Sequence, residues 1–147
     1  MNDVSKRVKA LAERDPFITL LGAECVAAGP GAAVVRLTVG EQHMNFNGTC
    51  HGGVLFSLAD SAFGLASNSH GRLAAAVDAH VGFTAPARIG DRLIATAREM
   101  NRSNRIGIYR VDVRREDDGL VAAFTGTVYI STREHPQISN ADEKRTV

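Results

Sequence analysis

The segment from Gly53 to Asn68 constrains the fold of this chain more than any other, because apolar residues occur on almost every side of the helix that its pattern predicts. A helix of this kind is usually buried in a soluble protein. Its small and polar residues recur at helical spacing and form one narrow stripe, which consists of Ser57, Asp60, Ser61, Gly64 and Asn68. We therefore expect a buried central helix whose polar stripe faces a particular partner or ligand.

Strand patterns stand on both sides of this helix in the sequence. Alternating or β-branched residues predict strands at 24–28, 32–39, 73–83, 91–100, 106–115 and 120–129. An amphipathic helix is predicted at 4–13, and 17–21 is an apolar link of uncertain form. The expected fold class is α+β, with one antiparallel sheet wrapped around a long central helix. Exposed sheet edges in such a fold favour dimerisation through an edge strand.

The bulk composition excludes several classes of protein. At 147 residues the chain fits one domain with its own core, and a net charge of +1 gives no electrostatic case for nucleic acid or a membrane surface. No window approaches the roughly 20 apolar residues of a membrane helix. Residues 1–15 lack the apolar core of a signal peptide, and two cysteines are too few for a disulfide scaffold. We expect a cytoplasmic protein with neither a nucleic-acid nor a membrane partner.

The residues His51-Gly52-Gly53 lead into the central helix, and Asp60 follows Gly53 by seven positions. Backbone amides at the start of a helix can hold a developing negative charge. A carboxylate among Leu, Phe and Ala side chains is rarely there for stability alone. Together these features predict an acyl-transfer site in which amides hold the oxyanion and Asp60 drives the attack.

This order of elements resembles the hotdog fold, and specifically the PaaI-like acyl-CoA thioesterases. The residues that carry the resemblance are Asn45, His51-Gly52-Gly53, Asp60, Phe83-Thr84-Ala85-Pro86-Ala87 and Gly90-Asp91. The form CHGG-x-LFSLAD-x-AF is most similar to the phenylacetate-degradation thioesterases. The division that the resemblance implies is an N-terminal helix at 1–16, a hotdog thioesterase domain at 17–131 and a polar C-terminal tail at 132–147.

The resemblance implies hydrolysis of an aromatic acyl-CoA, such as phenylacetyl-CoA or hydroxyphenylacetyl-CoA, in a cleft between two subunits. One protomer would supply the acid, and the other would supply the Asn and the His-Gly-Gly segment. Neither a metal nor a cofactor is required, because coenzyme A is part of the substrate. A homodimer that pairs into a homotetramer is the implied assembly.

Asp60 is the predicted base or nucleophile, since hydrolysis needs either an activated water or an attacking carboxylate. Both roles require the ionised form, which a hydrogen bond from Ser57, Ser61 or Ser67 would favour. The alternative for Asp60 is an ion pair with an Arg in a dimer interface. Gly53 is the predicted oxyanion donor through its N–H. Its alternative, shared with Gly52, is a tight turn that requires positive φ.

Asn45 and His51 are expected to organise the site. Asn45 matches the family position that holds a water or polarises the thioester carbonyl, although a loop Asn commonly bonds its own backbone and Asn47 is a possible equivalent. The ring of His51 is expected to fix the loop or to bond near the thioester, with general base as the alternative. Adjacent residues of an extended segment point to opposite sides, so Cys50 is interpreted as a buried thiol rather than part of a Cys–His dyad.

Substrate-binding residues are predicted from pattern and position. Besides Gly52, the acyl pocket is expected to use Phe46, Leu55, Leu58 and Phe63. Asp78 and His80 share a strand face, where they could line that pocket or orient Asp60 from the partner chain. The alternative is a satisfied pair within the sheet or at an interface. Turn or strand-end arginines that could meet the CoA phosphates are Arg88, Arg92, Arg102 and Arg105. No metal-ligand spacing relates His43, His70 and His135.

Two other functions fit parts of this pattern. A hotdog dehydratase would use His51 with Asp60 on an acyl thioester and would release an enoyl thioester instead of free CoA. A non-catalytic acyl-CoA sensor would bind the thioester without turnover. Such sensors usually act through an attached DNA-binding domain, for which this chain has no room. The continuous helix from His-Gly-Gly to the acid favours hydrolysis.

Overall fold

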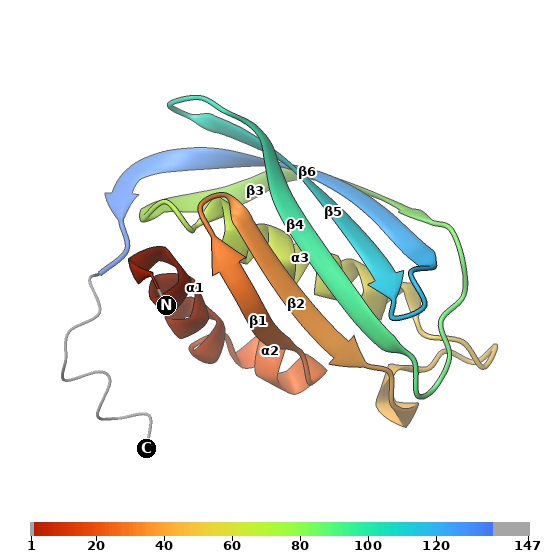
Figure 1. The fold of residues 1–147 in the computed structure, drawn as a ribbon. Helices are drawn as coiled ribbons and strands as arrows, with labels where there is room; N and C mark the ends of the chain where they lie inside the picture. Colours follow the sequence, from red (N-terminus) through yellow and green to blue (C-terminus); the bar gives the residue numbers. More distant parts are fainter. Residues whose placement is uncertain (1, 137–147) are drawn as a thin grey trace, which may run out of the picture.

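The computed structural model describes residues 2–136, and it consists of one curved antiparallel sheet with helices on its concave side (Figure 1). In chain order the elements are α1 (Asp3–Glu13), α2 (Pro16–Leu21), β1 (Glu24–Gly29), β2 (Ala32–Thr38), the 3-10 helix η1 (Glu41–His43), α3 (Gly52–Ser67), β3 (Arg72–Phe83), β4 (Arg92–Arg102), β5 (Ile106–Arg115) and β6 (Leu120–Glu134). The strand order is β1-β2-β4-β5-β6-β3, with every neighbouring pair antiparallel. The expected α+β architecture is confirmed.

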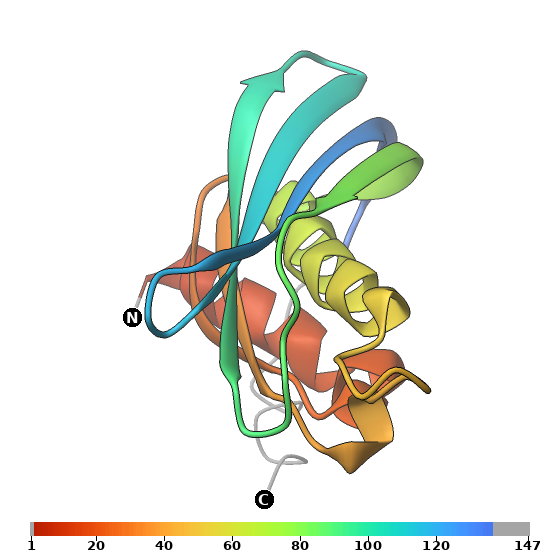
Figure 2. The same ribbon diagram turned by 90° about the vertical axis from the view of Figure 1, so that its right-hand side faces the viewer.

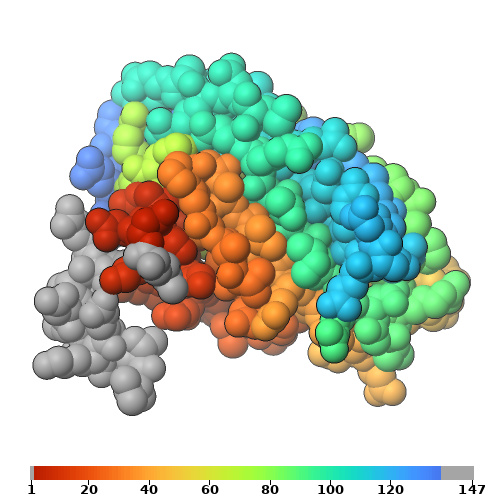
Figure 3. Space-filling model, viewed as in Figure 1, coloured from red at the N-terminus to blue at the C-terminus, as the bar shows by residue number. Residues whose placement is uncertain are grey.

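Helix α3 lies in the hollow of the sheet, and the strands curl around it (Figure 2). In the space-filling view, which has the orientation of Figure 1, β1, β2, β4 and β5 lie in front of it (Figure 3). Its inward residues are almost completely buried, including Leu58 and Phe63. Burying each such side chain contributes about 1.5–3 kcal/mol to folding. No helix between residues 2 and 136 has both the length and the apolar character needed to cross a membrane.

The ring of Phe63 is the centre of this core. Its centroid lies 5.7 Å from that of Tyr109 and 5.4 Å from that of Phe124, in tilted and edge-on arrangements that aromatic rings prefer. Gly126 in β6 leaves the necessary room, because a Cβ there would lie 2.7 Å from the ring of Phe63. The sheet and the helix can therefore approach closely at this point.

Two expectations about chain segments need correction. Residues 17–21 belong to α2, because Pro16 stands at the first turn and the Asp15 carboxylate caps it by accepting from the amides of Phe17 and Ile18, both at 3.0 Å. Residues 132–134 belong to β6 and not to a tail, because β3 is long enough to pair Arg72 with Glu134. Residues 137–147 of the expected tail lie outside the described part of the chain.

A polar cluster joins the far end of α3 to the sheet. Oε2 of Glu99 accepts the Tyr109 hydroxyl at 2.7 Å and lies 2.6 Å from Nε2 of His70. Burial raises the pKa of Tyr109, and its bond to Glu99 adds to this shift. Burial also acts to raise the pKa of Glu99, but the hydrogen bonds from His70 and Tyr109 outweigh it and lower that pKa. The cluster therefore stabilises the fold while Glu99 is ionised.

We predict that Tyr109→Phe lowers the free energy of unfolding at neutral pH by about 1.5–3 kcal/mol, because a hydrogen bond to a carboxylate is lost in a buried place. A folded-state pKa of Glu99 below its unfolded value contributes stability above the unfolded pKa and loses it as pH falls through the folded pKa. The difference between variant and wild type should therefore shrink in acid. Urea unfolding at several pH values measures it, with the half-exposed Tyr129→Phe as control. An equal loss in both variants would contradict the role of the cluster.

Candidate active site

The first turn of α3 is capped by the ring of His51. Nδ1 of His51 accepts from the amide of Gly53 at 2.8 Å, and the His51 carbonyl accepts from the amides of Val54 at 2.9 Å and Leu55 at 3.3 Å. Within the described residues no hydrogen bond engages the amide of Gly52. The predicted donor, the Gly53 N–H, is thus occupied by His51 in this structure, and the amide of Gly52 is the open one. The first expected role of His51, fixing the local chain, agrees with this geometry.

Gly52 and Gly53 allow two aromatic rings to approach the backbone at the start of α3. Neither is among the residues with positive φ, so the alternative explanation of a tight turn with positive φ is wrong. A Cβ on Gly52 would lie 3.2 Å from the ring of Phe83, and a Cβ on Gly53 would lie 3.0 Å from Nδ1 of His51. Side chains at these positions would crowd both rings and cover the amides.

Asn45 organises the loop before α3. Its Oδ1 accepts from the amides of Asn47 at 2.9 Å and Thr49 at 3.2 Å, and its Nδ2 donates to Oγ1 of Thr49 at 3.1 Å. Gly48 closes the turn with φ of 77°. The local role of a loop Asn is therefore present. An amide carries two N–H groups, so one donor of Asn45 is still available in a fixed orientation.

Asp60 lies exposed on the stripe of α3 that faces away from the sheet. The expected serine partners are wrong: the hydroxyls of Ser57 and Ser61 donate to helix carbonyls at 2.7 Å, and that of Ser67 donates to the Gly64 carbonyl at 3.1 Å. No ion pair to Asp60 forms among residues 2–136. Partial burial raises the pKa of Asp60, and the negative charge of Asp15 raises it further.

One chain does not bring the helix-start amides and Asp60 to the same point. Gly53 and Asp60 are seven residues apart on one helix, which separates them by about 10 Å along its axis. A thioester carbonyl and the water that attacks it are within about 3–3.5 Å of each other in a reactive complex. The amides and the carboxylate of the same chain therefore cannot act on one carbonyl.

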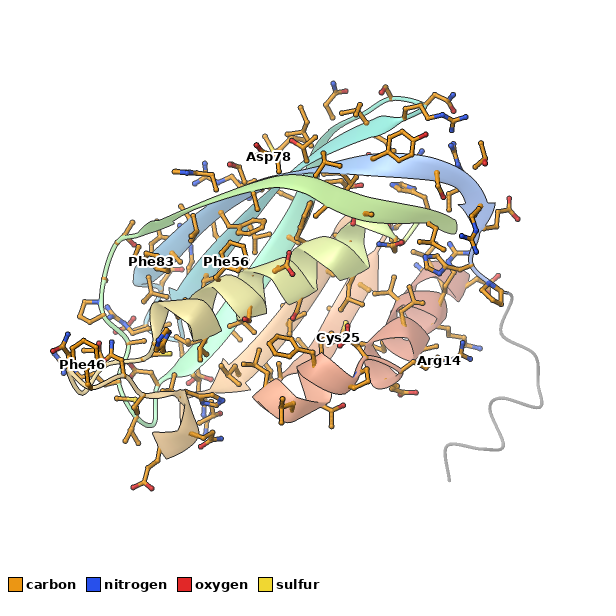
Figure 4. The ribbon with its side chains drawn as sticks, turned by 180° about the vertical axis from the view of Figure 1, so that it is seen from behind. Arg14, Cys25, Phe46, Phe56, Asp78 and Phe83 are labelled. Atoms are coloured by element: carbon orange, nitrogen blue, oxygen red, sulfur yellow. The ribbon has the colours of Figure 1, made fainter. Side chains whose placement is uncertain are left out.

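A cavity of about 390 Å³ adjoins the start of α3. Its lining consists of Thr49, Cys50, Gly52, Leu55, Phe83, Thr84, Ala85 and Pro86. Among the predicted acyl-pocket residues Gly52 and Leu55 line it. Leu58 and Phe63 belong to the hydrophobic core instead, because the inward face of α3 is filled by the sheet. Phe46 lies at the loop tip with 98% of its surface exposed (Figure 4).

The residues of this cavity that sequence reasoning did not assign to a pocket are Phe83, Thr84, Ala85 and Pro86. Pattern analysis treated them only as part of a family motif. The available signal was Pro86, which lacks a backbone N–H and follows the end of β3 at Phe83. Cys50 has 5% of its surface exposed, and burial, followed by the charge of Asp91, raises the pKa of its thiol to about 11. The interpretation of Cys50 as a buried thiol is confirmed.

Asp78 and His80 share a strand face, as expected, but it is the wrong face for Asp60 of the same chain. They pair with Thr127 and Thr125 of β6, whereas the residues of β6 that meet α3 alternate with these. Asp78 accordingly points away from α3 in Figure 4. The two residues do not line the cavity, and their expected orientation of Asp60 from the partner chain stays a prediction.

The predicted phosphate-binding arginines lie at opposite ends of the sheet. Arg88 follows Pro86 at the cavity end, and Arg92 pairs with Glu116 at 3.4 Å near that end. Arg102 and Arg105 flank the turn between β4 and β5 at the other end. One chain does not gather them into a single site. Among the described residues no three His, Cys, Asp or Glu side chains are grouped so as to hold a metal ion.

Comparison with known proteins identifies the family. The profile of the thioesterase superfamily matches residues 47–122, a span that includes the helix start, Asp60 and the cavity. The chain belongs to the thioesterase superfamily.

Individual relatives show which members of the superfamily this chain is similar to. A putative esterase of Archaeoglobus fulgidus is 39% identical over 86% of this chain and 82% of its own length. The acyl-coenzyme A thioesterase PaaI of Escherichia coli is 38% identical over 80% of this chain and 84% of its own. The solved structure of the E. coli PaaI protein from the phenylacetic acid degradation operon superposes with a TM-score of 0.86, at 34% identity over 90% of this chain and 99% of that one. The expected resemblance to PaaI-like hotdog thioesterases is confirmed.

Another similar solved structure contains bound acetyl CoA. It is a Streptococcus mutans protein bound to acetyl CoA, with a TM-score of 0.74 and 25% identity over 77% of this chain and 91% of that one. The hotdog arrangement of this superfamily member is therefore shared with a protein that holds a CoA thioester.

We predict that Asp60 titrates above the ordinary range of an aspartate, and that Asp15→Asn lowers the pKa of Asp60 because it removes a neighbouring negative charge. Asn is also a good N-cap, so α2 should stay folded. Carboxyl-carbon NMR titration of both proteins measures the shift. An unchanged Asp60 pKa in Asp15→Asn would show that burial alone raises it.

Proposed function

We propose that this protein hydrolyses acyl-CoA thioesters to a free acid and CoA. The observation that carries the proposal is the design of α3, which presents backbone amides at its start and an exposed carboxylate of raised pKa on its outward stripe. Membership of the thioesterase superfamily, a relative that is an acyl-CoA thioesterase and a neighbour bound to acetyl CoA support it.

In the proposed reaction the carbonyl oxygen of the thioester accepts from amides at the start of α3. Asp60 takes a proton from water as the water oxygen bonds to the carbonyl carbon, or its carboxylate attacks directly and forms an anhydride that water then cleaves. In the first route the C–S bond breaks as the tetrahedral intermediate collapses, and the CoA thiolate takes the proton from Asp60. In the second route the C–S bond breaks as the anhydride forms, and the water that later cleaves the anhydride supplies the oxygen of the acid and the proton for the thiolate. A raised pKa makes Asp60 a stronger base for this proton transfer.

His51 must move for Gly53 to take part. Its ring now accepts the Gly53 N–H at 2.8 Å, where the oxygen of a thioester would lie. The ring is at the protein surface, so it is free to rotate when substrate arrives. Loss of this cap costs about 1 kcal/mol, which a hydrogen bond to the developing oxyanion offsets.

A second copy of the chain would complete the site. The amides and Asp60 of one protomer are about 10 Å apart along α3, so the carboxylate that serves one set of amides is proposed to come from another protomer. Strand β3 is an edge of the sheet with exposed Val77 beside the bulge near Asp78, which suits pairing with a partner. We propose a homodimer, with further pairing into a homotetramer as in the resembling family.

The proposed acyl group is aromatic, of the phenylacetyl or hydroxyphenylacetyl type. The cavity beside the helix start has the size of a small-molecule pocket and is bounded by the half-exposed Phe83. The likeness to a PaaI protein from a phenylacetic acid degradation operon points the same way.

We expect Asp60→Asn to lower the rate of CoA release by at least about a hundredfold, because the amide can neither attack nor accept a proton. Thiol release is followed with a colorimetric reagent on phenylacetyl-, hydroxyphenylacetyl-, benzoyl- and aliphatic acyl-CoAs. Asp118→Asn, in the turn between β5 and β6, is the matched control and should retain wild-type rates. An enoyl thioester as product, or binding of every substrate without release, would instead favour the dehydratase or the sensor.

A mixing experiment tests the shared site. Asp60→Asn and Asn45→Ala are each expected to be nearly inactive alone, and refolding them together in equal amounts should restore about a quarter of wild-type activity, because half of the dimers are mixed and each has one intact site. If both groups acted within one chain, no mixed dimer would contain an intact site. Activity that stays at the level of the separate variants would therefore contradict a site shared between subunits.

A further inference from the structure

Two phenylalanines outside the buried core lie next to the two parts of the proposed site: Phe83 beside the helix-start amides and Phe56 one turn before Asp60. Gly52, Phe56 and Asp60 follow one another at intervals of four residues, so they form a single row along α3. Phe56 is thus the aromatic side chain one turn before Asp60. Figure 4 shows Phe56 and Phe83 along the boundary between α3 and β3.

Phe83 is placed by Gly52. The ring stands against the bare backbone of Gly52, where a Cβ would lie 3.2 Å from Cζ and 3.4 Å from Cε1. More than half of its surface, 55%, is exposed, and it forms a wall of the cavity next to the open amide of Gly52. An exposed phenylalanine held in this place offers an apolar surface directly beside the position of a polarised carbonyl.

Phe56 packs against the core on one side and is only partly buried. Its ring lies edge-on to the buried Phe124, with centroids 5.6 Å apart and planes inclined by 65°. The residue is nevertheless only partly buried, so the rest of its ring reaches the surface of α3. Because Phe124 packs in turn on Phe63, the position of Phe56 is tied to the rigid centre of the core.

We propose that Phe56 and Phe83 form the aromatic wall of the acyl site and select an aromatic acyl group over an aliphatic one of similar size. The inference rests on the proposed thioesterase function. In the proposed shared site, a thioester carbonyl at the helix start of one protomer lies beside Phe83 of that protomer. The Asp60 that serves this carbonyl comes from the other protomer and brings its own Phe56 to the same acyl group. Rings prefer edge-on or offset contacts with other rings, which a flexible alkyl chain cannot reproduce.

The test compares kcat/KM for phenylacetyl-CoA and hexanoyl-CoA in wild type, Phe83→Leu and Phe56→Leu. Each variant should lower the aromatic-to-aliphatic ratio by about two- to tenfold, the factor that corresponds to one aromatic pair. Loss of the ring should lower the phenylacetyl-CoA rate more than the hexanoyl-CoA rate, because an alkyl chain makes no ring-to-ring contact. General damage to the fold would lower both rates and leave their ratio unchanged. Tyr129→Leu, an exposed aromatic on the opposite face of the sheet, is the control and should not change the ratio.

Phe83→Leu decides the outcome if Phe56→Leu unfolds, because Phe83 is exposed and its loss leaves no buried cavity. A ratio within twofold of wild type in Phe83→Leu and in a folded Phe56→Leu would overturn the assignment, and so would a wild type without aromatic preference. In these cases hydrolysis itself would still stand. Absence of CoA release from every substrate by the wild type would instead overturn the thioesterase function and this inference with it.

Discussion

Burial of α3 inside the curved sheet is the constraint on which the rest of this structure depends. A helix that is apolar on most of its circumference must be covered, and the six strands cover it on all sides but one. The ring of Phe63 on α3 packs against both Tyr109 and Phe124 of the sheet. The uncovered side is the small and polar stripe that includes Asp60, so the same packing that stabilises the fold also presents the proposed carboxylate.

The two ends of α3 have different chemistry. At its start, bare glycine backbone allows the rings of His51 and Phe83 to approach the first amides. Beyond its end, Glu99 gathers His70 and Tyr109 into a buried polar cluster that ties the helix to β4 and β5. The aromatic contacts from Phe56 through Phe124 and Phe63 to Tyr109 span the distance between them. The proposed oxyanion donors thus lie at the end of α3 where the backbone is left accessible.

The Gly53 amide already donates to the ring of His51, so a glycine at a helix start does not by itself provide a free donor for an oxyanion. An amide at a helix start satisfies itself with the nearest acceptor, and here that acceptor is the N-cap ring one residue outside the helix. Such a cap protects the helix start without substrate and can be displaced at modest cost. Asn45 follows the same logic, since the hydrogen bonds that build its loop also orient its remaining donor.

Local pattern by itself determined most of the elements and the family. Apolar periodicity located α3 within one residue, and alternating or β-branched residues located all six strands. The resemblance carried by His-Gly-Gly, Asp60 and the downstream motifs indicated the superfamily that the comparisons identify. It missed α2, whose Asp15-Pro16 cap was readable, and the end of β6, which depends on the length of its partner β3.

Only the tertiary structure decided which apolar residues are core and which line a cavity. Leu55, Leu58 and Phe63 look alike in the sequence and all three are buried, but only Leu55 also borders the cavity beside Phe83. It also decided that Asp78 and His80 face away from α3, because a strand pattern shows that residues share a face without showing which face meets the helix. The physical reason is general: periodicity depends on backbone geometry within one element, whereas a site depends on distances between elements that only packing sets.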